Sequence, residues 1–321
     1  MTVKSRILQE LERSDGRAVS GQSLADALGV SRAAVWKGIQ ALRSEGYAIE
    51  AATNRGYRLA MGGEKLSSEG VSAHRAGRFA DAPVYVHDVL DSTNTEIKRL
   101  ALNGAPHGTL VLADGQTAGR GRRGHTFFSP PGTGLYMSAL LRAEARPSEA
   151  YRFTLAAAVA VCDAVQAELG VRPGIKWVND MLVDGRKVAG LLTEAVTDFE
   201  SGLTEFVVIG MGINLQPPQG GFPPDVAPVA AALCDVPVNR NRLAARLADA
   251  LFEALALSPE RLLERYRADC VVPGRRIRFQ MDGREREAMA LAVQDDGGLL
   301  VQLADGTRQT LHSGEISVSL T

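Results

Sequence analysis

The stretch "GTLVLADGQTAGRGRRGHTFFSPPGTG", residues 108–134, separates two fold classes. Its apolar start predicts a strand, and the glycines at 119, 121 and 124 have the G-x-G-x-x-G spacing of a dinucleotide-binding turn. That turn requires a helix to begin at the third glycine. The prolines and glycines at 130–134 exclude such a helix. The stretch therefore argues against a nicotinamide enzyme and predicts a glycine loop whose arginines bind phosphate or carboxylate.

Strand-like and helix-like segments mix around this loop, from about residue 66 to residue 268. Several predicted strands follow one another without an intervening helix, which favours antiparallel neighbours over the parallel strands of a doubly wound fold. We expect an α+β unit over 66–268, with a mixed, largely antiparallel β-sheet and helices on one side.

Residues 1–62 show a different pattern, three short helical segments followed by two predicted strands. The turn "GVS", residues 29–31, has the length and the glycine of a helix-turn-helix, and an Asn54-Arg55-Gly56 turn would join the strands into a wing. Nine Lys and Arg against six Asp and Glu give this segment a charge of +3. The arrangement is similar to a winged helix-turn-helix DNA-binding domain, with a small helical protein-binding module as the alternative.

The third helical segment carries the residues expected to bind DNA, which are Ser31, Arg32 and Lys37. Gly38 lies inside the same segment and lowers helix stability by about 1 kcal/mol, which weakens the case for sequence-specific binding. Trp36 is expected to pack in the core or against another domain rather than to read bases.

After Pro273 the chain is a run of short predicted strands. Asp-Gly pairs at 282 and 305 and the sequence "DDGG" at 295–298 predict the turns between them. Residues 270–321 are therefore predicted to form a small SH3-like β-barrel.

The 321 residues include 36 basic and 37 acidic side chains, so the net charge of -1 favours neither nucleic acid nor membrane and any DNA contact must be local. The three cysteines lack the spacing of a zinc site or a disulfide framework. The charged N-terminus has no apolar signal-peptide core, and no apolar run approaches the ~20 residues of a membrane span. We expect a cytoplasmic protein.

Three further polar clusters indicate a ligand site. "KWVNDMLVDGRKVAGLLTE", residues 176–194, places a lysine at a strand end beside a carboxylate, which suits an anionic substrate with a metal-bound polyphosphate. "DSTN", residues 91–94, offers hydroxyls and an amide, although Thr93 and Glu96 also match a helix capping box. "GMGINL", residues 210–215, combines glycines for close approach with an amide at a strand end.

Taken in order, "DSTN", "GQTAGRGRRG", "KWVND", "KVAGLLTE" and "GMGINL" resemble the motifs of biotin–protein ligases. The N-terminal helix-turn-helix makes the resemblance strongest to the bifunctional BirA-type family, biotin–protein ligase and biotin-operon repressor. The resemblance implies an enzyme that activates biotin with ATP to biotinyl-5′-AMP and transfers biotin to a lysine of a biotin carboxyl carrier protein. It also implies operator DNA as a partner, biotinyl-AMP as corepressor, and a homodimer when the adenylate is bound.

The resemblance assigns a role to each matching position. Lys176 and Arg122 would be catalytic. Biotin would be bound by Ser92, Thr93, Asn94, Gln116, Arg120, Gly121, Arg122, Lys176 and Gly190. ATP or the adenylate would be bound by Arg120, Arg122, Arg123, Asn179 and Asn214, and Mg²⁺ by Asp180.

Two positions depart from the family pattern. His125 stands where the family has Arg or Lys, so the charge at this end of the loop is expected to depend on pH. Val178 replaces the proline of "KWPND", which is expected to loosen the turn that presents Asn179. Two alternatives stay open: a lipoate–protein ligase, which normally lacks "GRGRRG" and a DNA-binding unit, and a ligand-sensing DNA-binding repressor without ligase activity.

Overall fold

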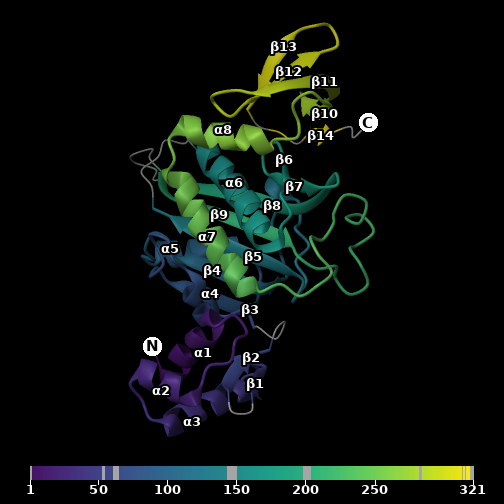
Figure 1. Ribbon diagram of the computed structural model, residues 1–321. Coiled ribbons are helices and arrows are strands. Elements are labelled where there is room, and N and C mark those ends of the chain that lie inside the picture. Colours follow the sequence, from purple (N-terminus) through teal and green to yellow (C-terminus); the bar gives the residue numbers. More distant parts are fainter. Residues whose placement is uncertain are drawn as a thin grey trace.

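The computed structural model describes residues 2–52, 55–60, 65–142, 150–197, 204–281, 284–312, 314 and 316–318. The predicted turn residue Asn54, residues 61–64, the predicted turn at 282–283 and residues 319–321 lie outside these ranges. The described chain forms three units in a row, with the N-terminal unit at one end, a large sheet in the middle and the C-terminal unit at the other end (Figure 1).

The N-terminal unit consists of α1 (Val3–Arg13), α2 (Gly21–Leu28), α3 (Arg32–Ser44), β1 (Ile49–Ala52) and β2 (Gly56–Leu59). Each helix begins at a hydroxyl side chain that accepts a hydrogen bond from a backbone amide of the first turn. The strands pair antiparallel as the predicted wing. A Cβ at Gly38 would lie 2.5 Å from Ile7 Cδ1, so this glycine lets α3 approach α1 closely.

The central unit is a seven-stranded sheet in the order β3-β4-β5-β9-β8-β7-β6. Only β3 and β4 pair in parallel and every other described pair of neighbours is antiparallel, which confirms the predicted mixed, largely antiparallel sheet. Its strands are β3 (Val84–Leu90), β4 (Leu110–Gln116), β5 (Gly134–Leu141), β6 (Gly174–Lys176), β7 (Asp180–Val183), β8 (Arg186–Thr197) and β9 (Thr204–Asn214). Its helices are α4 (Ser68–His74), α5 (Thr93–Leu102), α6 (Ala150–Leu169), α7 (Arg240–Ala256) and α8 (Pro259–Asp269).

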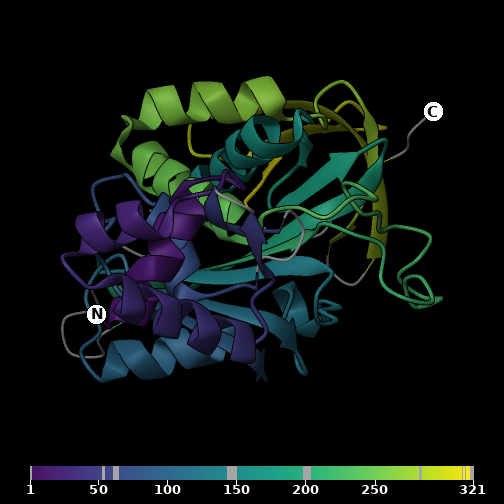
Figure 2. The ribbon, with the colours of Figure 1, turned by 60° about the horizontal axis from the view of Figure 1, so that its bottom comes forward.

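The helices cover both faces of this sheet, so the prediction that they lie on one side is wrong in that detail (Figure 2). α6 and α7 share a core with Leu110 and Leu141, whereas Ile97 of α5 packs with Val111 and Leu140 on the opposite face. Strands β4 and β5 are apolar at successive positions because each face meets a helix.

The C-terminal unit is a five-stranded antiparallel sheet in the order β13-β12-β11-β10-β14. Its strands are β10 (Arg276–Met281), β11 (Arg284–Val293), β12 (Leu299–Leu303), β13 (Arg308–Leu311) and β14 (Ile316–Val318). The pairs among the described residues do not close the sheet into a full barrel. The indole of Trp177 donates a hydrogen bond of 3.0 Å to Gly297 O and joins this unit to the central one.

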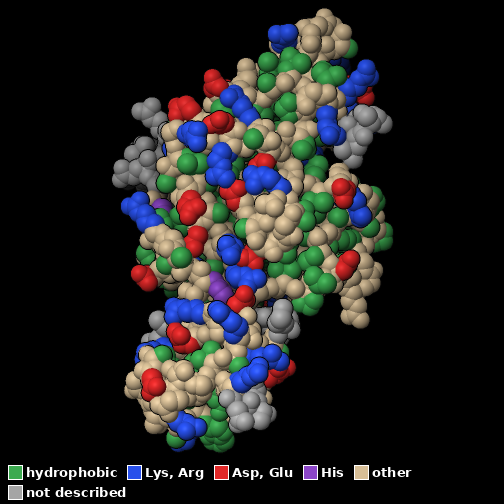
Figure 3. All heavy atoms as spheres, viewed as in Figure 1, with side chains coloured by type: hydrophobic (Ala, Val, Ile, Leu, Met, Phe, Trp, Pro, Cys, Tyr) green, Lys and Arg blue, Asp and Glu red, His purple; other side chains and the backbone are tan. Residues whose placement is uncertain are grey.

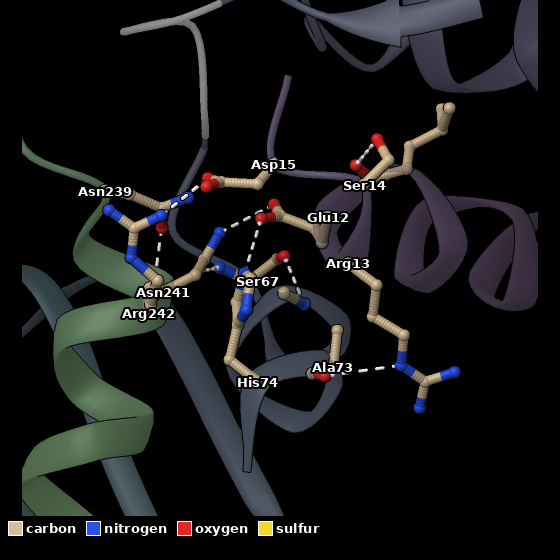
Figure 4. A network of polar contacts seen from close by, with 12 residues as sticks. Glu12, Arg13, Ser14, Asp15, Ser67, Ala73, His74, Asn239, Asn241 and Arg242 are labelled. Atoms are coloured by element: carbon tan, nitrogen blue, oxygen red, sulfur yellow. Dashed lines mark hydrogen bonds and ion pairs between the residues drawn. The ribbon is translucent and has the colours of Figure 1, made fainter. Parts of the chain in front are cut away.

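A buried polar network joins the N-terminal unit to the central unit (Figure 4). Glu12 of α1 is 1% exposed, and its carboxylate lies 2.8 Å from Asn241 Nδ2 of α7 and 3.3 Å from His74 Nε2 of α4. Asn241 Oδ1 in turn accepts a hydrogen bond from the amide of Ser67. Because the Glu12 carboxylate is buried and bonded to residues of both α4 and α7, the contact fixes α1 against both helices.

Basic and acidic side chains are interspersed on the face shown in Figure 3. Within the described ranges, none of the helices combines the length and the apolar character needed to cross a bilayer.

Candidate active site

A cavity opens where the sheet, the glycine loop and the C-terminal unit meet. It is lined by the start of α5, the loop at 120–127, the turn at 176–180, strands β8 and β9, and Gly314 and Ile316 of the C-terminal unit. Twelve of the thirteen positions expected at the biotin and ATP sites line it: Ser92, Thr93, Asn94, Gln116, Arg120, Gly121, Arg122, Arg123, Lys176, Asn179, Asp180 and Gly190. Segments spread over more than 200 residues of sequence thus meet at one place.

The polar residues at the start of α5 serve the cavity and do not form a capping box. Ser92 is the N-cap residue, but its side chain makes no capping hydrogen bond. Instead, Gln116 Oε1 of β4 accepts hydrogen bonds from Thr93 N at 2.9 Å and Thr93 Oγ1 at 3.2 Å. Glu96 pairs with Arg99. The capping-box interpretation is therefore wrong, because a neighbouring strand supplies the cap.

Ser138 and Glu194 hold the side chain of Asn94 in place. The buried Ser138 hydroxyl lies 2.6 Å from Asn94 Oδ1, and Asn94 Nδ2 donates a hydrogen bond of 2.8 Å to Glu194 Oε2. Burial opposes ionisation of Glu194, but hydrogen bonds from Lys98 and Asn94 and the charges of Lys98 and Arg120 outweigh it, so the pKa of Glu194 lies below its ordinary value. Glu194 therefore stays ionised and orients the amide.

The glycine loop folds as a tight hairpin. Gly121 N donates to His125 O at 2.7 Å, and Phe127 N donates to Gly119 O at 2.9 Å. Arg122–Gly124 form a single 3-10 turn in which Arg123 has a φ of 53°. No α-helix begins in this described segment, which agrees with the exclusion of a dinucleotide-binding turn.

Arg122 connects this hairpin to two other segments. Its Nη1 donates hydrogen bonds to Asn179 Oδ1 at 3.0 Å and to Gly314 O at 3.2 Å. Asn179 Nδ2 donates to Leu191 O, and Tyr266 OH donates to Val178 O at 3.2 Å. The turn that presents Asn179 is thus held by hydrogen bonds on both sides.

Two lysines converge on one carboxylate in the cavity. Lys187 Nζ lies 2.7 Å from Asp180 Oδ1, and Lys176 Nζ lies 3.6 Å from Asp180 Oδ2. The sequence predicted Lys176 and Asp180, but it left Lys187 without a role. Lys187 follows a hairpin turn and pairs with Leu182 of the neighbouring strand β7. This position in the hairpin was the signal that could have identified it.

Phe127 is a second cavity residue that sequence reasoning missed. Its ring fills the space above two glycines that face each other across β8 and β9, Gly190 and Gly212. A Cβ at Gly212 would lie 2.6 Å from the ring. The Lys187 ammonium lies 5.8 Å from the ring centroid. An aromatic face beside cations suits a planar base attached to phosphates.

Two predicted roles find less support in the geometry. Asn214 does not line the cavity, because its Nδ2 donates to Ala231 O at 3.2 Å. The two oxygens of Asp180 face lysines, and no group of three acidic, histidine or cysteine side chains gathers among the described residues. The residues present therefore do not form a resident magnesium site of their own.

The cavity is strongly cationic. Arg120, Arg122, Arg123, Lys176 and Lys187 line it, against Asp180 as the single carboxylate in the described lining. Fixed cations next to hydroxyl and amide groups can bind a small polar molecule at one end and a polyphosphate at the other.

The expected DNA-binding residues lie at the far end of the molecule. Ser31 caps α3 through a hydrogen bond of 3.2 Å from Ala34 N. Arg32 and Lys37 are exposed on the first half of α3. The structure therefore places Ser31 at the N-cap of α3 and Arg32 and Lys37 within the helix, in a fold of the expected type.

Sequence comparisons agree with this architecture. The profile of the biotin/lipoate A/B protein ligase family matches residues 86–214, that of an HTH domain residues 3–58, and that of the biotin protein ligase C terminal domain residues 273–319. The bifunctional ligase/repressor BirA of Bacillus subtilis is 33% identical over 326 residues, covering 99% of both chains. The chain belongs to the BirA family of bifunctional ligase/repressors.

Other relatives support the same family. The BirA protein of Escherichia coli is 29% identical over 95% of this chain and 94% of its own length. The biotin--[acetyl-CoA-carboxylase] ligase of Mycobacterium tuberculosis is 32% identical over 70% of this chain and 85% of its own. A biotin protein ligase from Aquifex aeolicus in complex with biotin shares the fold, with a TM-score of 0.61, 23% identity and coverage of 74% and 99%. The BirA-type resemblance and the predicted fold class are thus confirmed.

Proposed function

We propose that this protein is a biotin–protein ligase and a biotin-operon repressor. The observation that carries the ligase half is a cavity lined both by five cations and by the polar start of α5, within a BirA-type chain. The repressor half rests on the winged helix, with α3 exposed and the wing beside it.

The first reaction joins biotin to ATP. The biotin carboxylate attacks the α-phosphorus of ATP, a carboxyl–phosphate bond forms, the bond to the β-phosphate breaks, and pyrophosphate leaves. Ser92, Thr93, Asn94 and Gln116 hold the polar head group, and Gly190 lines the same cavity. Arg120, Gly121, Arg122, Arg123, Lys176 and Lys187 stabilise the negative charge that builds on the phosphate oxygens, where one well-placed donor contributes roughly 2.7–4 kcal/mol.

The second reaction transfers biotin to a protein. The amine of a lysine on a biotin carboxyl carrier domain attacks the acyl carbon of biotinyl-5′-AMP, an amide forms, and AMP leaves with the proton released from the amine. The loop, tied to Asn179 by Arg122, retains the adenylate and excludes water until the carrier arrives. Mg²⁺ would be held by the phosphates of ATP and would neutralise part of their charge, because both oxygens of Asp180 already face lysines.

Adenylate formation and DNA binding are coupled in the regulation of transcription. Biotinyl-AMP acts as corepressor when two chains pair through their central units and present two reading helices to an operator. Coupling between the adenylate site and DNA must be reciprocal, so DNA also favours the adenylate-bound form.

One assay separates this proposal from its alternatives. Biotin-dependent ATP–pyrophosphate exchange is expected, with no exchange above background when lipoate replaces biotin. Exchange with lipoate instead would favour a lipoate–protein ligase, and biotin binding without exchange would favour a repressor that lacks ligase activity. Gel-shift titration on the promoter of the protein's own biotin genes, with biotin plus ATP or with neither, tests the repressor half.

A further inference from the structure

The largest exposed hydrophobic side chain of the described residues lies on the reading helix. Trp36 of α3 is 55% exposed, so the expectation that it packs in the core or against another domain is wrong. α3 lies at the end of the molecule remote from the central sheet (Figure 1). Because the indole is more than half exposed on a helix expected to bind DNA, its apolar face is accessible to a partner.

Trp36 belongs to a continuous exposed face of α3. Val35, Ile39 and Leu42 form the buried face of the helix. Arg32 and Ala33 precede Trp36 by one turn and are exposed, and Lys37 is exposed beside it. The indole therefore projects from the same surface as the two cations expected to contact DNA.

The cations of this surface are unlike the others of residues 1–62. Six of the nine Lys and Arg are engaged by groups within the protein: Lys4, Arg6, Arg13, Arg17, Arg43 and Arg58. Among the described residues, Arg32, Lys37 and Arg55 make no hydrogen bond or ion pair. Two of these three, Arg32 and Lys37, lie on α3 with Trp36, and Arg55 lies at the wing, so the cations available to phosphates belong to the two elements expected to meet DNA.

The chemistry of the indole restricts what it can recognise. Its single N–H donor cannot form the paired hydrogen bonds that identify guanine or adenine, whereas its large apolar face can bury a methyl group. In the major groove, the 5-methyl of thymine is the apolar group that distinguishes this base edge from the others. We infer that Trp36 is a specificity-determining residue that packs against thymine 5-methyl groups of the operator.

This inference rests on the proposed DNA-binding function and adds a base preference to it. The test uses the full chain with biotin and ATP at one fixed salt concentration. The promoter fragment is amplified with either thymidine or deoxyuridine triphosphate, because uracil differs from thymine only by the 5-methyl group. Wild-type protein is expected to bind the uracil fragment about fourfold more weakly for each methyl group that it buries.

Three variants decide the outcome. Trp36→Ala is expected to bind both fragments equally, at the affinity that wild type has for uracil DNA or below. Trp36→Phe, which keeps an apolar ring, is expected to restore part of the thymine preference. Lys37→Ala is the matched control: it is expected to weaken binding to both fragments and to leave their ratio as in wild type. Circular dichroism melting checks that each variant folds.

The possible failures are distinguishable. A thymine-to-uracil ratio that is unchanged in Trp36→Ala would overturn the inference, as would a wild-type protein that binds both fragments equally. Wild-type protein that binds neither fragment, with or without ligands, would overturn the repressor proposal and this inference with it. Trp36 and Trp177 are the two tryptophans of the chain, and Trp177 is buried. A fluorescence change on DNA addition that is lost in Trp36→Phe therefore places DNA at Trp36.

Discussion

Glu12 Oε1 of the winged helix accepts a hydrogen bond of 2.8 Å from Asn241 Nδ2 of α7, across the junction of two units (Figure 4). Both residues are 1% exposed. Asn241 also accepts a bond from Ser67 N and donates one to Lys65 O. A buried carboxylate is costly unless it is hydrogen-bonded, so the asparagine makes the close packing of the two units possible.

Asn241→Ala is expected to lower the free energy of unfolding by about 3 kcal/mol. The change leaves the Glu12 carboxylate and the Ser67 amide buried with fewer partners, and unpaired buried groups lose their hydration without compensation. Urea titration monitored by circular dichroism measures the effect. Asp15→Ala is the matched control, because Asp15 pairs with Arg242 at the same junction but has 63% of its side chain exposed. Its loss is expected to cost below about 1 kcal/mol. Equal losses in the two variants would contradict the role of burial.

Lys187→Ala is expected to slow biotin-dependent ATP–pyrophosphate exchange by about two orders of magnitude. Lys187 lies 2.7 Å from Asp180 in the cationic cavity, and a fixed cation at a reacting phosphate contributes roughly 2.7 kcal/mol or more. Lys176→Ala is expected to behave in the same way. Lys65→Ala removes a lysine outside the cavity whose side chain is half exposed, and exchange should stay at the wild-type rate. An exchange rate within twofold of wild type in both cavity variants would show that neither lysine takes part in the reaction.

Gly212→Ala is expected to displace Phe127 from the cavity. The new Cβ would lie 2.6 Å from the Phe127 ring, which is closer than two non-bonded carbon atoms can approach. Combining the change with Phe127→Ala should relieve this conflict, so a double-mutant cycle is expected to give a coupling energy of about 1 kcal/mol or more. Thermal unfolding of the four proteins supplies the cycle. Additive effects would show that the ring does not occupy this space.

The glycines show why the sequence predicted the site but not its construction. Spacing and resemblance identified the loop, Lys176 and the start of α5, because each motif is local in the chain. The reason for Gly210 and Gly212 is not local: Asn94 of α5 lies against one and Phe127 of the loop against the other. A pattern within "GMGINL" cannot reveal which distant side chains fill the space.

The fold, like the site, was predictable where the information is local in the sequence and not where it depends on contacts between distant segments. The adjacent predicted strands correctly indicated a mixed, largely antiparallel sheet, since local order along the chain determines which neighbours can be antiparallel. The face on which α5 packs depends on Ile97 meeting Val111 and Leu140, a tertiary choice that apolar runs leave open. Likewise, Trp36 was expected in the core or against another domain, because hydrophobicity does not distinguish a buried residue from a recognition residue.

Glu194→Gln is expected to lower stability near neutral pH and to have little effect in acid. Folding lowers the pKa of Glu194 from its ordinary value of 4.5, so the stabilisation that it provides is complete above that value and is lost as the pH falls through the lower folded pKa. The variant retains a hydrogen-bonding oxygen but no charge for Lys98. Unfolding free energies of the two proteins should therefore differ most near pH 7 and converge as the pH falls below 4.5 through the lower folded pKa. A constant difference across this range would contradict the assignment.

Arg122→Ala is expected to loosen the glycine loop even without ligands. The lost guanidinium donates to Asn179 Oδ1 and Gly314 O, and these contacts tie the hairpin to the β6–β7 turn and to the C-terminal unit. Chymotrypsin cleaves after Phe127 and Phe128, so the nicking rate at these residues reports how often the loop opens. We expect a rise of about tenfold, because a hydrogen bond from a charged group contributes about 1.5 kcal/mol or more.

Arg123→Ala is the matched control: Arg123 is exposed in the same turn, and its side chain makes no hydrogen bond or ion pair among the described residues. Its nicking rate without ligands should equal that of wild type, and biotin plus ATP should slow nicking in wild type more than in Arg122→Ala. If both arginine variants are nicked at the wild-type rate, the contacts of Arg122 do not hold the loop, and its effect on the reaction would have to come from the phosphate alone.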